Sequence, residues 1–189
     1  QTELVKLLVS PHPDYLRVAY ETGITREFLP EFDACMETEQ NTPHHCYTVG
    51  EHILHGLLLV RPDKVLRLTM LLHDIAKPVM RKTDENGRDH FKMHAPEGEK
   101  MAKSILRRLK FDNDTISKVS RLIKRRTVAN EACDAGRVLV NDKPAKASVQ
   151  VKTGDTVEIQ FGSRNVKVEV LEVKETVKKD EVESMFRYI

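Results

Sequence analysis

The sequence predicts a mainly α-helical body followed by a small α+β module. Through about residue 110 the apolar residues recur at helical spacing, whereas Val157–Phe161 and Val166–Val170 alternate with the period of two that is typical of strands. All eight histidines lie between His12 and His94. Because such a break in composition separates modules with different roles, and 189 residues suit one large domain or two small ones, we expect two parts.

Prolines and glycines divide the first part into short helices, because proline lacks the N–H that a helix interior needs and glycine suits the residue after a helix. The predicted helices are Tyr15–Thr22, Thr48–Val60, Asp63–His73 and Pro96–Leu109, with a turn at Asp84–Gly87. In the second part we predict a helix over Asp114–Arg125, a second short helix over about Thr127–Ala135, strands at Arg137–Val140 and the two alternating segments, and a surface helix over Lys178–Tyr188.

The bulk properties exclude several classes of protein. The longest apolar run, Ile53–Val60, is interrupted by His55 and is too short to span a membrane, so we expect no membrane partner. No basic and apolar leader opens the sequence, which favours a cytoplasmic location. The three cysteines form no C-x-x-C pair, so reduced thiols are expected rather than a zinc knuckle or a disulfide framework.

Histidines and a carboxylate cluster around the run Leu71–Pro78. His52 and His73 are 21 residues apart, enough for one helix, a turn at Pro62 and a return helix that brings the two imidazoles together, and Asp74 follows at once. Neutral imidazole and carboxylate are ligands of divalent first-row metals, and such a metal activates water and polarises a phosphoryl oxygen. One turn further on, Lys77 could steady a phosphate, and His90 and His94 could line the same mouth. The remaining histidines are expected to be structural (His12, His44 and His55) or to support the ligands (His45).

His52 together with the run HDIAKP resembles the HD superfamily of metal-dependent phosphohydrolases. The stretches FLPEFDACMETEQNTPHHCYTVGEHILHGL, LRLTMLLHDIAKP and TDENGRDHFKMHAPEGEKMAKSILRRLKFDNDTI resemble the HD-containing body of bacterial tRNA nucleotidyltransferases, the CCA-adding enzymes, over about residues 2–124. This resemblance implies metal ligands at His52, His73 and Asp74 with His94 nearby, and a divalent ion that could be Mn, Ni, Mg, Fe or Zn. Catalytic roles would fall to Asp74, Lys77 and His94.

The sequence departs from that family in three ways. The nucleotidyltransferase head, with its G-[GS]-x-x-R-D and D-x-D signature, does not occur, so CCA addition is not expected. The position that the resemblance assigns to a last Asp ligand is Thr127, which is a poor ligand beside carboxylate, and Arg125 and Arg126 would repel a divalent cation. Ala76 also replaces the glycine that is usual in HDIGKP. The metal site is therefore expected to be incomplete.

From Lys118 the sequence KVSRLIKRRTVANEACDAGRVLVNDKPAKASVQVKTGDTVEIQFGSRNVKVEVLEVKE resembles the S-four RNA-binding domain, in particular its small ribosome-associated bacterial members. The resemblance covers about residues 118–189. We therefore predict a helical HD-type domain over residues 1–117, an S-four-type (αL-type) α+β domain over residues 118–189, and a helix over residues 112–126 shared at the junction.

Basic residues of the predicted helices are candidates for RNA contact because guanidinium groups suit phosphates. The candidates are the basic residues Lys118, Arg121, Lys124, Arg125, Arg126 and Arg137, together with the polar Asn130. Charge alone would favour a solvated surface, but the ordered motif favours RNA, and the scarcity of aromatic residues favours folded RNA over single strands.

Three hypotheses remain open. The first is a protein that binds structured rRNA, tRNA or the ribosome and carries an incomplete HD site. The second is a metal-dependent phosphohydrolase or phosphodiesterase acting on nucleotides or RNA ends and directed by the RNA-binding module. The third is an HD-like scaffold in a recombined chain without a joint function.

Overall fold

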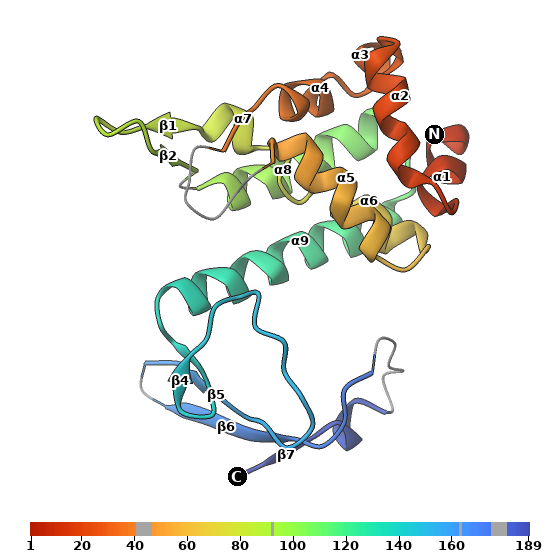
Figure 1. Ribbon diagram of the computed structural model, residues 1–189. Helices are drawn as coiled ribbons and strands as arrows, with labels where there is room; N and C mark the ends of the chain where they lie inside the picture. Colours follow the sequence, from red (N-terminus) through yellow and green to blue (C-terminus); the bar gives the residue numbers. More distant parts are fainter. Residues whose placement is uncertain (41–46, 92, 163, 175–180) are drawn as a thin grey trace. The chain divides into compact units, whose positions relative to one another are not determined.

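The computed structural model describes residues 1–40, 47–91, 93–162, 164–174 and 181–189 of the chain (Figure 1). The chain forms two compact units, Gln1–Arg125 and Arg126–Ile189. The division after Arg125 lies eight residues beyond the boundary predicted after residue 117. The predicted domain assignment stays a prediction. No helix among the described segments is long and apolar enough to cross a membrane.

Short helices build the first unit, as predicted. In chain order they are α1 (Thr2–Val9), the 3-10 helix η1 (Pro13–Tyr15), α2 (Leu16–Glu21), α3 (Ile24–Phe28), α4 (Pro30–Met36), α5 (Val49–Leu59), α6 (Lys64–Leu72), α7 (Lys77–Met80) and α8 (His94–Arg108). The predicted turn at Asp84–Gly87 joins two short antiparallel strands, β1 (Lys82–Thr83) and β2 (Asp89–His90). Apolar side chains from α1 through the first half of the helix over Asn113–Asp134 (α9) form one core, in which Phe32, Ile53, Leu68 and Leu106 are fully buried.

Helices α5 and α6 pack against each other and form the centre of this unit. Both begin at capping side chains: Thr48 Oγ1 accepts from the Glu51 amide at 3.1 Å, and Asp63 Oδ1 accepts from the Val65 amide at 2.9 Å. These bonds satisfy amides that have no partner within the helix. Two glycines of α5 let neighbouring methionines approach closely, because a Cβ at Gly50 or Gly56 would collide with Met36 or Met70 respectively.

The two helices predicted around residue 126 are one. Helix α9 runs without interruption over Asn113–Asp134, so the predicted break between Arg125 and Thr127 is wrong. Neither proline nor glycine occurs between Asn113 and Gly136, and lysine and arginine at positions 124–126 favour a helix, so nothing local stops it. Gly136, at φ +68°, follows the helix as predicted.

The second unit contains an antiparallel sheet with strand order β4-β3-β5-β6-β7. Its strands are β3 (Val138–Val140), β4 (Lys143–Pro144), β5 (Thr156–Gln160), β6 (Asn165–Val170) and β7 (Phe186–Tyr188). The prediction of β3, β5 and β6 is confirmed, but the predicted surface helix at the tail is wrong where the tail is described. There the 3-10 helix η2 (Val182–Ser184) precedes β7, whose alternating aromatic residues pair with β6.

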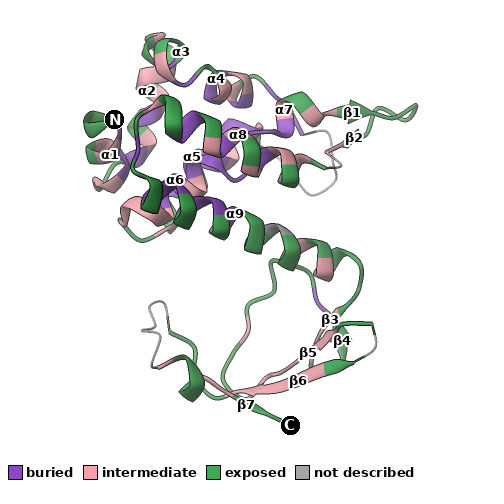
Figure 2. Ribbon diagram, turned by 180° about the vertical axis from the view of Figure 1, so that it is seen from behind, coloured by how far each residue is buried: buried purple, intermediate pink, exposed green. Residues whose placement is uncertain are grey.

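The two faces of this sheet differ in polarity. On one face Val157 lies across from Val168, and Val170 across from Phe186. On the other, the Lys167 ammonium faces the Glu158 carboxylate at 3.9 Å, and an ion pair joins Arg187 to Glu169. Among the described residues of this unit, Ala145 alone is buried, so the valines of the apolar face stay half-exposed (Figure 2).

Candidate functional site

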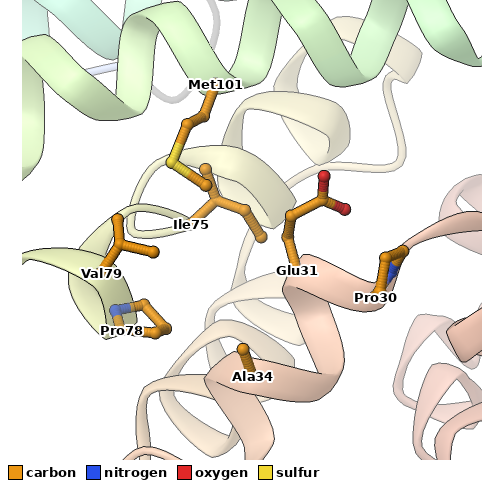
Figure 3. A pocket seen from close by; sticks show the side chains of 7 residues that line it. All are labelled: Pro30, Glu31, Ala34, Ile75, Pro78, Val79 and Met101. Carbon is orange, nitrogen blue, oxygen red and sulfur yellow. The ribbon is translucent and has the colours of Figure 1, made fainter.

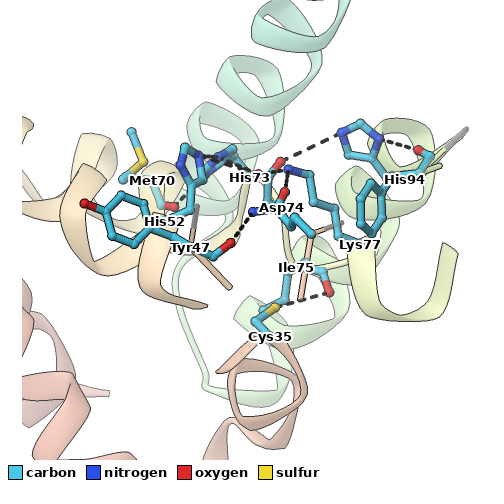
Figure 4. Close-up of polar contacts among 11 residues, drawn as sticks. Cys35, Tyr47, His52, Met70, His73, Asp74, Ile75, Lys77 and His94 are labelled. Atoms are coloured by element: carbon cyan, nitrogen blue, oxygen red, sulfur yellow. Dashed lines mark hydrogen bonds and ion pairs between the residues drawn. The ribbon is translucent and has the colours of Figure 1, made fainter. Parts of the chain in front are cut away.

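Two imidazoles and one carboxylate meet where α5 passes the end of α6. His52 projects from the first half of α5, His73 is the residue after α6, and Asp74 begins the turn that leads to α7. His73 Nε2 lies 3.3 Å from His52 Nε2 and 3.2 Å from Asp74 Oδ2, and His52 Nε2 lies 3.7 Å from the same oxygen (Figure 4). The predicted approach of His52, His73 and Asp74 is therefore present in the structure.

Backbone carbonyls set the tautomers of two histidines in this cluster. Nδ1 of His73 lies 2.7 Å from the Met70 carbonyl, and Nδ1 of His94 lies 2.6 Å from the Phe91 carbonyl. Because a carbonyl oxygen only accepts, each Nδ1 carries a hydrogen, and Nε2 is the ring nitrogen left to face the cluster. His73 Nε2 faces His52 and Asp74, and His94 Nε2 lies 3.8 Å from Asp74 Oδ1.

The ammonium of Lys77 also takes part in the cluster. Its Nζ lies 2.7 Å from Asp74 Oδ2 and donates to Oε1 of Gln40 at 2.8 Å. It also lies 5.5 Å from the centre of the Phe91 ring, within the range of a cation–π interaction. Only 10% of the Lys77 side chain is exposed, so this cation is anchored inside the fold.

Burial and charge act in opposite directions on Asp74. Burial alone would raise the pKa of its carboxyl, but the His73 ring and the Lys77 ammonium outweigh burial and hold that pKa well below its usual range. Beneath the cluster, burial raises the pKa of the Cys35 thiol, whose Sγ lies 4.0 Å from the Ile75 carbonyl. Asp74 is thus an anion and Cys35 a neutral thiol, as expected for a reduced cysteine.

The other histidines lie elsewhere. His90 binds Asp84 at 2.8 Å within the β1–β2 hairpin, so it does not share the cluster's contacts, contrary to the expectation that it lines the same mouth. His12 stacks on Tyr15, and His55 contacts Tyr47. His44 and His45 lie outside the described residues. Gln40 and Phe91, which contact Lys77, were not predicted, because an isolated amide or phenyl ring in a sequence carries no pattern.

A shallow apolar pocket of about 270 Å³ lies on the far side of Ile75. Its lining is Pro30, Glu31, Ala34, Ile75, Pro78, Val79 and Met101 (Figure 3). The Glu31 carboxylate there is held by Arg108 through two hydrogen bonds of 2.8 and 2.6 Å. The pocket shares no polar group with the histidine cluster.

The basic residues of α9 are all exposed. Arg121 and Arg125, four residues apart, share one face, opposite the buried Ile116, Val119 and Ile123. The Lys118 ammonium forms an ion pair with Asp114, with Nζ 2.6 Å from Oδ2. Within the described part of the chain, no acidic side chain pairs with Arg121, Lys124, Arg125 or Arg126.

The candidates of the second unit are less uniform. Arg137, which follows Gly136, is exposed, whereas Asn130 is half-buried. The side chain of Thr127, at the position where the family resemblance implies a further Asp, lies outside the described residues.

Comparison with known proteins first shows which domain family the second part of the chain belongs to. The S4 domain family matches residues 114–157, which cover most of α9 and the strands β3 and β4, so the chain is an S4-domain protein in this part. The RQC P-site tRNA stabilizing factor of Halalkalibacterium halodurans is 52% identical over 73 residues, 39% of this chain and 83% of that protein. The factor of the same name from Bacillus subtilis is 51% identical over 73 residues, 39% of this chain and 85% of that protein. Through its S4 part the chain belongs to the family of these factors.

A second similarity covers more of the chain. The CC-adding tRNA nucleotidyltransferase of Thermus thermophilus is 35% identical over 130 residues, 65% of this chain. The chain spans only 30% of the length of that enzyme. The similarity supports the predicted relation to tRNA nucleotidyltransferases, whereas the HD character of the helical unit remains a proposal.

Proposed function

We propose that this protein binds structured RNA, either tRNA or large-subunit rRNA, through the basic side of α9 and Arg137. The S4 domain and the tRNA-associated relatives support an RNA-binding role. The observation that carries the proposal is the set of exposed cations on α9, Arg121, Lys124, Arg125 and Arg126, without acidic partners among the described residues. A cytoplasmic location is part of this proposal.

The spacing of these cations suits a phosphate backbone. Side chains four residues apart on a helix lie about 5–6 Å apart at their Cβ atoms, so Arg121 and Arg125 can reach neighbouring phosphates. Guanidinium groups bind phosphate oxygens in pairs, and contacts of this kind position a protein on RNA without reading its sequence. Affinity should therefore depend on RNA shape and on salt.

The experiment compares the wild-type chain with the double variant Arg121→Ala/Arg125→Ala in binding to a tRNA transcript and to an rRNA fragment over a series of salt concentrations. Loss of two phosphate contacts should weaken binding and lower the slope of log K against log salt by about 2. The matched control is Lys6→Ala/Lys100→Ala, which removes two surface cations that pair with glutamates. Equal loss in both variants, or no binding at low salt, would refute the proposal.

A metal-dependent phosphohydrolase or phosphodiesterase is the second candidate, and the convergence of His52, His73 and Asp74 favours it. Their donor atoms lie within 4.8 Å of one another. Ligands about 2.1 Å from one ion lie about 3.0–3.5 Å apart, so the separations of 3.2 and 3.3 Å fit a divalent cation, and the 3.7 Å between His52 Nε2 and Asp74 Oδ2 is slightly longer than that range. Such a cation would supply Lewis acidity and an activated water.

In this second function the chain's own residues would hold the ion and orient the substrate. His52, His73 and Asp74 would bind the ion, Asp74 and His94 would act beside it, and Lys77 would meet a substrate phosphate. CCA addition is not proposed, because the chain spans less than a third of the nucleotidyltransferase that it resembles. The test is the metal content of the purified chain and its hydrolysis of cyclic and terminal nucleotide phosphates with Mn, Ni or Mg. If His73→Ala changes neither, the second candidate fails.

A further inference from the structure

We propose that the Lys77 ammonium is the resident cation of the histidine cluster, and that a divalent ion binds only by displacing this ammonium from Asp74. This inference rests on the second proposed function, since it concerns the same donor atoms. Its starting point is a shared oxygen. Oδ2 of Asp74 lies 3.2 Å from His73 Nε2, and the same atom lies 2.7 Å from Lys77 Nζ.

Distances show the conflict between the two cations. An ion bound about 2.1 Å from Oδ2 would lie within about 4.8 Å of Nζ, because the two bonds to one oxygen add to no more than that. A dication and an ammonium this close repel each other strongly where water is largely excluded. Asp74 is almost fully buried, with 8% of its side chain exposed, so solvent screens this repulsion little.

Lys77 is held in place by more than Asp74. Gln40 accepts a second hydrogen bond from Nζ at 2.8 Å, and the face of the Phe91 ring lies on the same cation. Gln40 itself donates to the Tyr47 carbonyl at 3.3 Å, which fixes its amide so that the oxygen faces Lys77. The ammonium therefore has three partners arranged around it, and its departure would leave each of them without a cation.

The negative charge of Asp74 in this cluster is consequently compensated by a side chain of the protein itself. A carboxylate buried among imidazoles needs a positive charge nearby, and Lys77 supplies it from the first residue of α7. An ion must therefore compete with an ammonium that the backbone holds at high local concentration. The wild-type chain should bind divalent ions weakly, whatever donors surround the site.

The test measures divalent-ion affinity directly, using full-length protein freed of metal by chelation and titrated with Mn²⁺ in a calorimeter. Lys77→Met keeps the length of the side chain and removes its charge, and should bind Mn²⁺ at least about tenfold more tightly, which corresponds to about 1.4 kcal/mol. Lys77→Arg keeps the charge and should stay as weak as wild type. Adding His52→Ala to Lys77→Met should abolish the tight binding, which assigns it to this cluster.

Because Lys77→Met leaves a buried carboxylate uncompensated, that variant can fail to fold without metal. Gln40→Ala provides the second measurement, since it removes one anchor of the ammonium and keeps the charge, and it should tighten Mn²⁺ binding by a few-fold. Tight binding by wild type that weakens in Lys77→Met and Gln40→Ala would overturn the inference and leave the metal site intact. No binding by any variant would overturn both the inference and the metal-dependent function.

Discussion

Substituting the glycines of the first unit tests how closely α5 is packed. An alanine Cβ at position 50 would lie 2.7 Å from the Cα of Met36, a backbone atom that cannot move aside. Overpacking of this kind costs about 1–3 kcal/mol, which exceeds the gain of about 0.5–1 kcal/mol from replacing a helical glycine by alanine. Gly50→Ala should therefore destabilise the chain.

Gly98→Ala is the matched control because Gly98 also lies in a helix, and its Cβ would meet the His73 carbonyl oxygen at an ordinary 3.6 Å. With space available, the substitution should stabilise by about 0.5–1 kcal/mol. Urea unfolding followed by far-ultraviolet circular dichroism gives both values. Equal stability of the two variants would refute the packing argument.

The remaining predictions concern charge and buried hydrogen bonds. Burial would raise the pKa of the Glu31 carboxyl, but Arg108 outweighs burial and holds that pKa below its usual value of 4.5. The ion pair therefore stabilises the fold fully above pH 4.5, and this stabilisation is lost as the pH falls through the lowered pKa. Glu31→Gln should cost about 0.5–1 kcal/mol at pH 7, since both side chains are partly exposed, and the difference from wild type should vanish under acid in urea titrations at each pH. Arg67→Met should cost about 1–3 kcal/mol in the same assay at neutral pH, because the guanidinium donates to the carbonyls of Leu8 and Arg61 and its loss leaves these acceptors without it. A pH-independent effect of the first variant, or a neutral effect of the second, would contradict the respective argument.

The sequence predicts the central features of the candidate site because these depend on local signals. Pro62 reverses the chain between two helices, and the spacing from His52 to His73 then places both imidazoles at one end of the helix pair. The role of Lys77 depends instead on Gln40, 37 residues away, which follows α4, a helix that packs against α7. No periodicity records a contact of this kind.

The two errors in the fold prediction have different origins. The predicted break between Arg125 and Thr127 is wrong on local grounds, because the sequence from Asn113 to Asp134 contains no helix-breaking residue and the helix continues. The predicted helix at the tail is wrong for a non-local reason, because Phe186 and Tyr188 pair with residues of β6. Pairing with a distant strand decides the structure of such a short segment.

The close approach of two methionines to α5 has a consequence for oxidative stress. Met36 and Met70 are half-buried, so oxidants can reach them, and their sulfur atoms lie over Gly50 and Gly56, where a Cβ would collide. Conversion to the sulfoxide adds a polar oxygen where these helices have little space. Because α5 also carries His52, and because the carbonyl of Met70 orients His73, oxidation of either thioether would disturb the histidine cluster without touching a histidine.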